Sequence, residues 1–192
     1  IDSAFQEKFG GNVLLRVALT GKAATSIHGS TLHSCTHGCA IPVGRKRHKR
    51  LKGQALKNLQ AYFKNAIALY IDEFTMMKQR DLHFLNLRLQ EIMGNDKPYG
   101  GLIIIFCGDP AQLPPVGGRA LWDNSLGGGS IEETSGFQKY RTELKDVVRL
   151  EVIERIDTAQ ESARVFRELL NRTRTGENTE ADYNLLAERS QG

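Results

Sequence analysis

Two adjacent carboxylates, Asp72 and Glu73, come directly after an apolar run at residues 66–71 and are the strongest candidates for chemistry in the chain. In open parallel sheets ligands bind outside the carboxyl ends of the strands, so we expect both side chains to project into that crevice. One carboxylate there can hold Mg²⁺ on nucleotide phosphates, while its neighbour orients or deprotonates the attacking water, which is the layout of a Walker B motif. The alternative is an exposed acidic pair at the start of a helix, where the helix dipole favours negative charge.

A second polar segment follows the next apolar run, residues 102–107, and contains Asp109 and Gln112. Gly108 lets the backbone turn where this run ends, and two consecutive prolines stiffen the exit from the segment. We expect Asp109 and Gln112 to lie on a rigid loop at the same sheet edge as the carboxylate pair, where they can respond to the γ-phosphate of a nucleotide. The alternative is a proline-rich surface turn, which two matching strand ends in one sheet disfavour.

The elements that must position these residues are strands that alternate with helices. Residues 13–19, 66–71 and 102–107 are apolar and rich in β-branched side chains, which predicts strands buried on both faces. The residues between the last two runs have helical spacing, and one set of apolar residues falls on a single helix face: Leu82, Leu85, Leu89 and Ile92. This alternation predicts an α/β fold with a parallel sheet.

The C-terminal third of the chain follows a different pattern. Residues 125–136 are rich in Gly and Ser, which predicts a flexible loop, and the strand signal fades after them. Asp157 is the predicted N-cap of a helix that ends at Gly176, and residues 179–188 predict a second short helix. The apolar stripe of the longer helix consists of Ala163, Phe166, Leu169 and Leu170.

The composition excludes several classes of protein. The chain has 192 residues, 40% hydrophobic and 25% charged, as in ordinary globular proteins and unlike disordered chains or disulfide miniproteins. Its longest apolar run is far shorter than the ~20 residues that span a bilayer, and no secretory signal is readable. Three cysteines favour free thiols in a reducing compartment, and a net charge of +4 permits a polyanionic partner. The first residue is Ile1, which suggests a fragment.

The chain resembles Pif-one-type DNA helicases, which belong with RecD to the 5′-to-3′ branch of helicase superfamily 1. Five segments occur in the order of the family's motifs: residues 20–24 (TGKAA), 29–34 (GSTLHS), 71–76 (IDEFTM), 98–101 (PYGG) and 108–116 (GDPAQLPPV). The PYGG segment is closer to the Pif-one branch than to RecD. The resemblance implies a motor of two RecA-like P-loop NTPase domains, each a parallel sheet flanked by helices, that hydrolyses ATP with Mg²⁺ while stepping along single-stranded DNA.

The resemblance also implies how the chain is divided. Residues 1–140 correspond to a partial first RecA-like domain, with a small wedge insertion near residues 36–60, and residues 141–192 to the start of the second. The phosphate-binding loop is missing, because G-x-x-x-x-G-K-[ST] needs Gly where Arg16 stands and Ser or Thr where Ala23 stands. In the family this loop lies upstream, so we expect the chain to begin in the helix that follows it.

The DNA-gripping motifs of the family correspond to two segments that follow predicted strands. They contain Thr20, Gly21, Lys22, Thr31, His33 and Ser34. Hydroxyl, imidazole and backbone N–H donors at strand ends suit phosphate contacts that fix register without reading sequence. The alternative is N-capping by Thr20 and Ser30 beside an ordinary surface histidine.

Two further features have several interpretations. Four potential zinc ligands alternate along the chain, but structural zinc sites use two short-spaced pairs separated by a longer loop. These four are His33, Cys35, His37 and Cys39. We expect Cys107 to be a small buried side chain in a strand. Residues 45–50 (RKRHKR) form a basic run that is a DNA-attracting surface, a nuclear signal or a solvated loop, and we favour DNA attraction.

Arg149 completes the residues that the resemblance implies for catalysis. It lies in residues 144–150, which resemble the motif that opens the second domain, although Leu150 stands where the family has Gln. An arginine there can neutralise charge on the γ-phosphate, and the alternative is an exposed arginine at a strand end. The resemblance assigns catalysis to Glu73, Gln112 and Arg149, nucleotide binding to Asp72, Asp109, Gln112 and Arg149, and Mg²⁺ binding through water to Asp72 and Glu73.

The resemblance implies that the whole protein is an ATP-dependent helicase that unwinds DNA 5′-to-3′ in DNA repair, recombination and telomere maintenance. We expect single-stranded and forked DNA as partners, no membrane, a monomeric motor, and the nucleus or mitochondrion as its location if the source is eukaryotic. This chain alone is expected to be inactive because it lacks the phosphate-binding loop. The alternatives are a RecD-like or transposon-encoded relaxase-helicase and a non-catalytic DNA-binding remnant.

Overall fold

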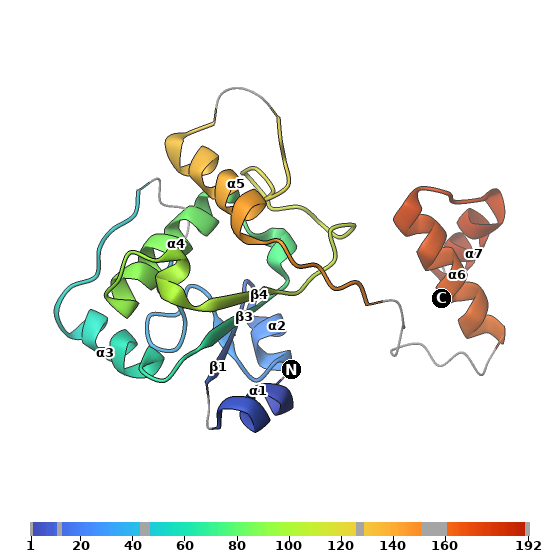
Figure 1. The fold of residues 1–192 in the computed structure, drawn as a ribbon. Coiled ribbons are helices and arrows are strands. Elements are labelled where there is room, and N and C mark those ends of the chain that lie inside the picture. The colour runs from blue at the N-terminus through green and yellow to red at the C-terminus, as the bar shows by residue number, and fades with distance from the viewer. Residues whose placement is uncertain (1, 11–12, 43–46, 126–128, 151–160, 191–192) are drawn as a thin grey trace. The chain divides into compact units, whose positions relative to one another are not determined.

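The computed structural model describes residues 2–10, 13–42, 47–125, 129–150 and 161–190 (Figure 1). They form two compact units, Ile1–Asp146 and Val147–Gly192. The first unit contains the sheet, and the second contains two helices. The assignment of residues 1–140 and 141–192 to two RecA-like domains stays a prediction.

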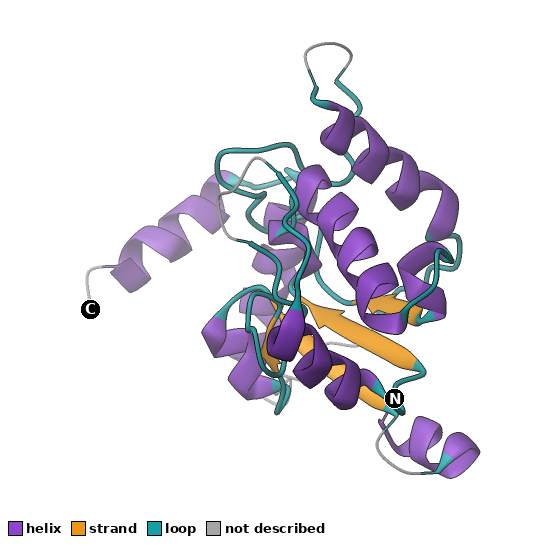
Figure 2. Ribbon diagram, turned by 90° about the vertical axis from the view of Figure 1, so that its left-hand side faces the viewer, coloured by secondary structure: helices purple, strands orange, loops and turns teal. Residues whose placement is uncertain are grey.

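Four parallel strands form the sheet, in the order β2-β1-β3-β4 (Figure 2). They are β1 (Leu14–Ala18), β2 (Ser30–Thr31), β3 (Ala68–Asp72) and β4 (Ile103–Phe106). In the register Ala18 lies beside Asp72, and Ile71 lies beside Phe106. The predicted α/β fold with a parallel sheet flanked by helices is confirmed.

The hydrophobic core lies on one face of this sheet, which α3 (Gly53–Phe63) and α4 (Gln79–Met93) cover. Side chains alternate between the two faces of a strand. The core contains the β1 and β3 residues of one face: Leu15, Val17, Leu69 and Ile71. The predicted apolar stripe of α4 packs against them, and all its members are buried: Leu82, Leu85, Leu89 and Ile92.

β4 is less buried than the sequence predicts. Ile103 is 50% exposed, and the other three residues of β4 are half-buried. Among the described strands β4 pairs with β3 only, so it forms an edge of the sheet and has a neighbour on one side. The prediction of a strand buried on both faces is therefore wrong for β4. Cys107 directly follows this edge strand and is half-buried instead of buried.

Helix α5 (Ile131–Glu143) occupies much of the segment for which the sequence predicts a flexible loop, so that prediction is wrong there. The Ser130 hydroxyl accepts a hydrogen bond from Glu133 N, and the Glu133 carboxylate accepts one from Ser130 N. This reciprocal cap starts the helix. Gly136 lets α5 approach α4 closely, because a Cβ there would lie 1.8 Å from Gln79 O. The Ser and Gly residues therefore serve capping and close packing.

Four short elements complete the first unit. Helix α1 (Asp2–Phe9) precedes the sheet, and most of its described side chains are exposed. Helix α2 (Gly21–Ser26) follows β1. Two 3-10 helices, η1 (Phe74–Met76) and η2 (Pro98–Gly101), follow β3 and precede β4, respectively. Therefore α2 and η1 begin near the carboxyl ends of β1 and β3, where predicted site residues lie.

The second unit contains α6 (Glu161–Thr175) and α7 (Glu180–Ser190), which confirms the two predicted helices. Gly176, with φ of +73°, follows the last residue of α6 as predicted. The predicted N-cap Asp157 lies outside the described residues. Within the predicted apolar stripe only Leu169 is buried.

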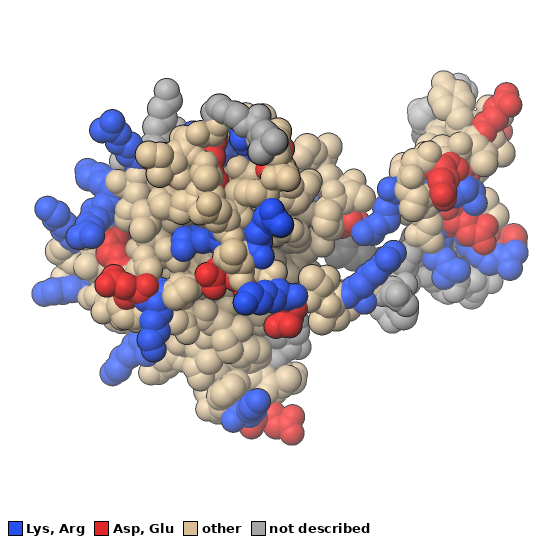
Figure 3. Space-filling model, turned by 45° about the horizontal axis from the view of Figure 1, so that its top comes forward, with Lys and Arg blue, Asp and Glu red and all other residues tan. Residues whose placement is uncertain are grey.

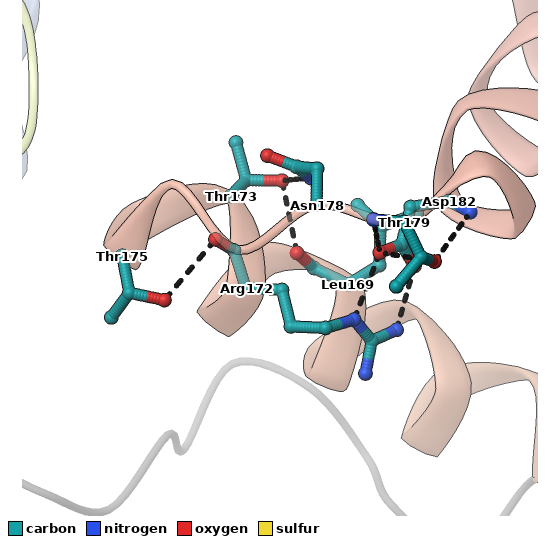
Figure 4. A network of polar contacts seen from close by, with 7 residues as sticks. All are labelled: Leu169, Arg172, Thr173, Thr175, Asn178, Thr179 and Asp182. Carbon is teal, nitrogen blue, oxygen red and sulfur yellow. Dashed lines mark hydrogen bonds and ion pairs between the residues drawn. The ribbon is translucent and has the colours of Figure 1, made fainter.

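An ion pair joins these two helices (Figure 4). Arg172 donates from Nε and Nη2 to the two carboxylate oxygens of Asp182, at 2.8 and 2.6 Å. Thr179 adds hydrogen bonds to Asp182 from its backbone N and its hydroxyl, at 2.9 and 3.0 Å. These contacts hold the pKa of the Asp182 carboxyl well below its usual range, with the Arg172 hydrogen bond as the largest cause. The pair is bidentate, the strong form of an arginine–carboxylate contact.

Candidate functional site

The predicted site residues of the first unit lie along one edge of the sheet. All strand pairings are parallel, so the residues that follow the strands meet at the same, carboxyl edge. From the strand order, the row along this edge runs from His33 and Ser34, through Thr20, Gly21 and Lys22, to Asp72 and Glu73, and ends at Asp109 and Gln112. We name this row the carboxyl-edge row.

The carboxylate pair stands at the centre of the row. Asp72 is the last residue of β3, Glu73 follows it, and both are half-buried. Glu73 has φ of 53° and ψ of 40°, the left-handed conformation that residues with a Cβ rarely adopt. This turn separates the pair, because Asp72 continues the strand while Glu73 starts the entry to η1. Backbone strain of this kind concentrates at functional sites.

Contacts between the ends of β3 and β4 bring the carboxylates beside the second polar loop. Phe74 N donates a hydrogen bond to Cys107 O at 3.1 Å. The Phe74 ring packs against Phe106, with ring centroids 5.4 Å apart. At Gly108 a Cβ would lie 2.9 Å from the Phe74 ring and 3.2 Å from its backbone N, so this close approach requires glycine.

The second polar loop is a tight turn at the end of β4. The Asp109 carboxylate accepts a hydrogen bond from Ala111 N at 3.0 Å, and its carbonyl accepts one from Gln112 N at 2.9 Å. Gln112 is exposed. Asp109 therefore shapes the turn that presents Gln112, and their contacts with a nucleotide stay a prediction.

Tyr70 lies beside the carboxylate pair, and sequence reasoning did not single it out. It precedes Asp72 by two positions in β3, so both side chains lie on the same face of the sheet. Burial, followed by hydrogen bonds to Cys107 and Asp72, raises the pKa of the Tyr70 phenol. Period-two spacing could have placed Tyr70 beside Asp72, but only the pairing of β3 with β4 adds Cys107.

The oxygen donors of this edge fit magnesium bound together with nucleotide phosphates. Mg²⁺ in such sites takes one or two protein carboxylates and completes its octahedral shell with water and phosphate oxygens. Asp72 and Glu73 supply two half-buried carboxylates, and the described residues contain no group of three or more possible metal ligands. The donor set therefore suits a cation shared with a nucleotide better than a cage made of protein alone.

The predicted DNA-gripping residues form the other half of the carboxyl-edge row. The Thr20 hydroxyl accepts a hydrogen bond from Ala23 N at 3.2 Å and caps α2, as one interpretation of the sequence expects. Ser30 lies within β2, so the N-cap alternative is wrong for that residue. Gly21 and Lys22 are exposed in the first turn of α2.

The end of β2 and the turn that follows it hold the remaining predicted residues. Thr31, His33 and Ser34 are half-buried, and His33 Nδ1 forms a hydrogen bond with Ile41 O at 2.9 Å. The Ser34 hydroxyl accepts a hydrogen bond from His37 N at 3.3 Å. Their contacts with DNA stay a prediction.

The alternating histidines and cysteines of this turn have separate environments. Cys39 is fully buried in the core, and burial raises the pKa of its thiol to about 12. Cys35 is exposed, and the His37 ring packs edge-on against Tyr62, with centroids 5.3 Å apart. Zinc binding requires thiolates and neutral imidazoles that converge on one point. The Cys39 thiol instead packs in the hydrophobic core, where burial disfavours the thiolate that zinc requires.

Arg149 is exposed and belongs to the second unit. It has no regular secondary structure, and it lies two positions before residues 151–160, which are outside the described residues. Its role at the γ-phosphate stays a prediction.

Comparisons with known proteins agree with this architecture. A profile of the PIF1-like helicase family matches residues 5–184. ATP-dependent DNA helicase Pif1 of Psychrobacter sp. is 36% identical over 102 residues, which are 53% of this chain and 15% of that protein. The chain therefore spans only a small part of this relative. Among the described residues, no helix has the length and apolar character needed to cross a membrane.

Two solved structures are similar to this chain. One shows DNA unwinding at forked double-stranded DNA by two coordinating Pif1 helicases, with a TM-score of 0.64 and 25% identity over 97% of this chain and 43% of that one. A crystal structure of Bacteroides Pif1 with ADP-AlF3 and single-stranded DNA has the same fold, with a TM-score of 0.64 and 23% identity over 96% of this chain and 41% of that one. With a family profile that covers most of its length, the chain belongs to the PIF1-like helicase family.

Proposed function

We propose that this chain is part of the motor of an ATP-dependent DNA helicase that unwinds DNA 5′-to-3′. One observation carries the proposal: a carboxylate pair ends a central strand of a parallel sheet, with Glu73 in a strained left-handed turn beside the Gly108–Gln112 loop. Family membership supports it. The related Bacteroides protein was crystallised with a nucleotide analogue and single-stranded DNA, the two ligands that this function requires.

The proposed roles divide the carboxyl-edge row into two halves. Asp72 and Glu73 hold Mg²⁺ on the ATP phosphates through water, and Glu73 also orients or deprotonates the attacking water. Asp109 shapes the loop from which Gln112 reaches the γ-phosphate, and Arg149 neutralises charge there from the second RecA-like domain. The other half of the row, together with Thr31 at the end of β2, holds the DNA backbone; its residues are Thr20, Gly21, Lys22, His33 and Ser34.

The proposed function requires a phosphate-binding loop from another part of the whole protein. The 192-residue sequence contains no G-x-x-x-x-G-K-[ST] segment. The outer edge of β4 has backbone groups to which one more parallel strand can pair, and Ile103 on it is half exposed. We propose that a strand carrying this loop completes the sheet at β4.

The proposed partners are single-stranded and forked DNA, on which the whole protein acts as a monomeric motor in DNA repair, recombination and telomere maintenance. The structure described for two coordinating Pif1 helicases at forked DNA supports the forked substrate. A non-catalytic DNA-binding remnant is the alternative, and an intact phosphate-binding loop in the whole protein contradicts it.

Substitution of the central carboxylates in the whole protein tests the proposal. Glu73→Gln keeps the size of the side chain but removes its charge, so ATP and DNA binding should persist while most turnover is lost. Asp72→Asn should instead weaken Mg²⁺-dependent nucleotide binding. Glu7→Gln, on the exposed helix α1, is the matched control and should change neither property. Unwinding at the normal rate by Glu73→Gln would show that the Walker B assignment is wrong.

A further inference from the structure

A cavity of about 900 Å³ opens in the first unit between the turn after β2 and the segment that leads into α3. Its lining contains five basic side chains: His33, Lys49, Arg50, Lys52 and Arg88. None of the described lining residues is Asp or Glu. Lys and Arg side chains also gather along the left-hand margin in Figure 3, the side that carries α3 in Figure 1. A concave surface lined by one sign of charge concentrates counter-ions, so this cavity attracts anions.

The walls of the cavity are held together by a buried arginine. Arg88 of α4 is 2% exposed, and its Nη2 donates hydrogen bonds to Lys49 O at 2.8 Å and to Ala40 O at 3.4 Å. Its Nη1 forms an ion pair with Glu91. A buried charge is costly unless it is paired, so the core fixes this guanidinium and, through it, both walls. The cavity is therefore a built feature of the fold.

The chemistry of the lining favours a phosphate backbone over bases. Lys49, Arg50 and Lys52 are exposed enough to reach a ligand, and lysine binds phosphate as a point charge. No Phe, Tyr or Trp is among the described lining residues, so the cavity lacks the aromatic platforms on which bases stack. Contacts of this kind position a strand without reading its sequence.

The position of the cavity favours a nucleic-acid strand over an isolated anion. His33 lies two positions after the end of β2 and lines the cavity, and β1, which leads to Thr20 and Lys22, is the neighbour of β2. The cavity therefore extends the carboxyl-edge row at the end opposite to Asp109. A strand held by that row would continue into it.

We propose that this cavity binds phosphodiester groups of a nucleic-acid strand, with Lys49, Arg50 and Lys52 as the charged contacts. The inference rests on the proposed function and deepens it, because it adds a second backbone-binding element to the row. A titration of the ¹⁵N-labelled chain with a short oligothymidine, followed by NMR, separates the two proposals. We expect the amide signals of residues 49–52 and of Ala55, which also lines the cavity, to shift.

Each outcome of the titration decides between the two proposals. Shifts in residues 20–22 and 31–34 without shifts in residues 49–52 would overturn the inference and leave the proposed DNA contacts standing. Shifts confined to residues 49–52 and Ala55 would support the inference and overturn those contacts. A spectrum that does not respond would overturn both. Equal cavity shifts with inorganic phosphate, at the same phosphate concentration, would overturn the inference by showing an anion site that does not need a nucleic-acid strand.

A charge-matched pair of variants tests the contacts themselves. The salt dependence of single-strand binding has a slope of about 0.7 for each phosphate that the protein neutralises, so Lys49→Gln with Lys52→Gln should reduce this slope by about 1.4. The control combines Lys64→Gln with Lys97→Gln, two exposed lysines that precede β3 and β4 and thus lie near the opposite edge of the sheet. It removes the same charge and should leave the slope unchanged. Equal slopes for the two double variants would overturn the cavity assignment.

Discussion

The left-handed backbone of Glu73 predicts a stability difference that is independent of its carboxylate. Both Glu73→Ala and Glu73→Gly remove the charge, but only alanine keeps a Cβ in the conformation with φ of 53°. A Cβ there costs roughly 1–2 kcal/mol, and the greater freedom of glycine in the unfolded chain offsets roughly 0.5–1 kcal/mol of that difference. We therefore expect Glu73→Gly to be more stable than Glu73→Ala by about 0.5–1 kcal/mol.

The assay for this difference is denaturant unfolding followed by tryptophan fluorescence. Trp122 is the only tryptophan of the chain and packs edge-on against Phe74, with ring centroids 6.3 Å apart. Because Phe74 follows Glu73 in the sequence, the fluorescence of Trp122 reports unfolding of the first unit close to Glu73. The slope of the transition should be the same for both variants, because both expose the same surface on unfolding.

A second pair of variants, Lys57→Ala and Lys57→Gly, is a control in which the stability difference between alanine and glycine should have the opposite sign. Lys57 is exposed in the middle of α3, where glycine should be less stable than alanine by about 1 kcal/mol. Opposite signs at Glu73 and Lys57 would show that the left-handed turn causes the effect. Greater stability of Glu73→Ala than of Glu73→Gly would refute the claim that strain is stored beside the carboxylate pair.

Three further predictions concern the chain and the whole protein. The 192-residue chain should show no appreciable DNA-stimulated ATPase, because its sequence lacks the phosphate-binding loop; turnover that survives further purification would contradict this. In the whole protein Arg149→Ala should lower kcat about 10³-fold with little change in the Kd for ATP. Pre-steady-state kinetics separate ATP binding from hydrolysis. A defect in binding alone would make Arg149 a structural residue. The lowered pKa of Asp182 means that its ion pair with Arg172 stabilises the second unit above the unfolded pKa of about 3.9. That stability should be lost as the pH falls further, and Asp182→Asn should abolish this dependence in unfolding followed by circular dichroism.

Local sequence patterns determined β1, β3 and β4, helix α4 and the residues at the carboxyl edge, but they did not predict β2. The runs that became β1, β3 and β4 are apolar because a parallel sheet buries most of its strands, and the α4 stripe repeats with the period of a helix. Parallel strands also require their carboxyl ends to meet, so Asp72, Glu73, Asp109 and Gln112 could be placed at one edge from the sequence. Their roles with a nucleotide come from family resemblance.

Only the tertiary structure decided the features that depend on a partner distant in sequence. Gly136 reads as part of a loop until α4 lies against it, because close helix packing and loop flexibility both favour glycine. β4 has the composition of a buried strand. It is partly exposed because, among the described strands, only β3 pairs with it. Arginine is rarely buried in proteins, yet Arg88 of α4 is buried and joins Ala40 to Lys49 across the basic cavity. Each of these outcomes is set by contacts that no local pattern of the sequence encodes.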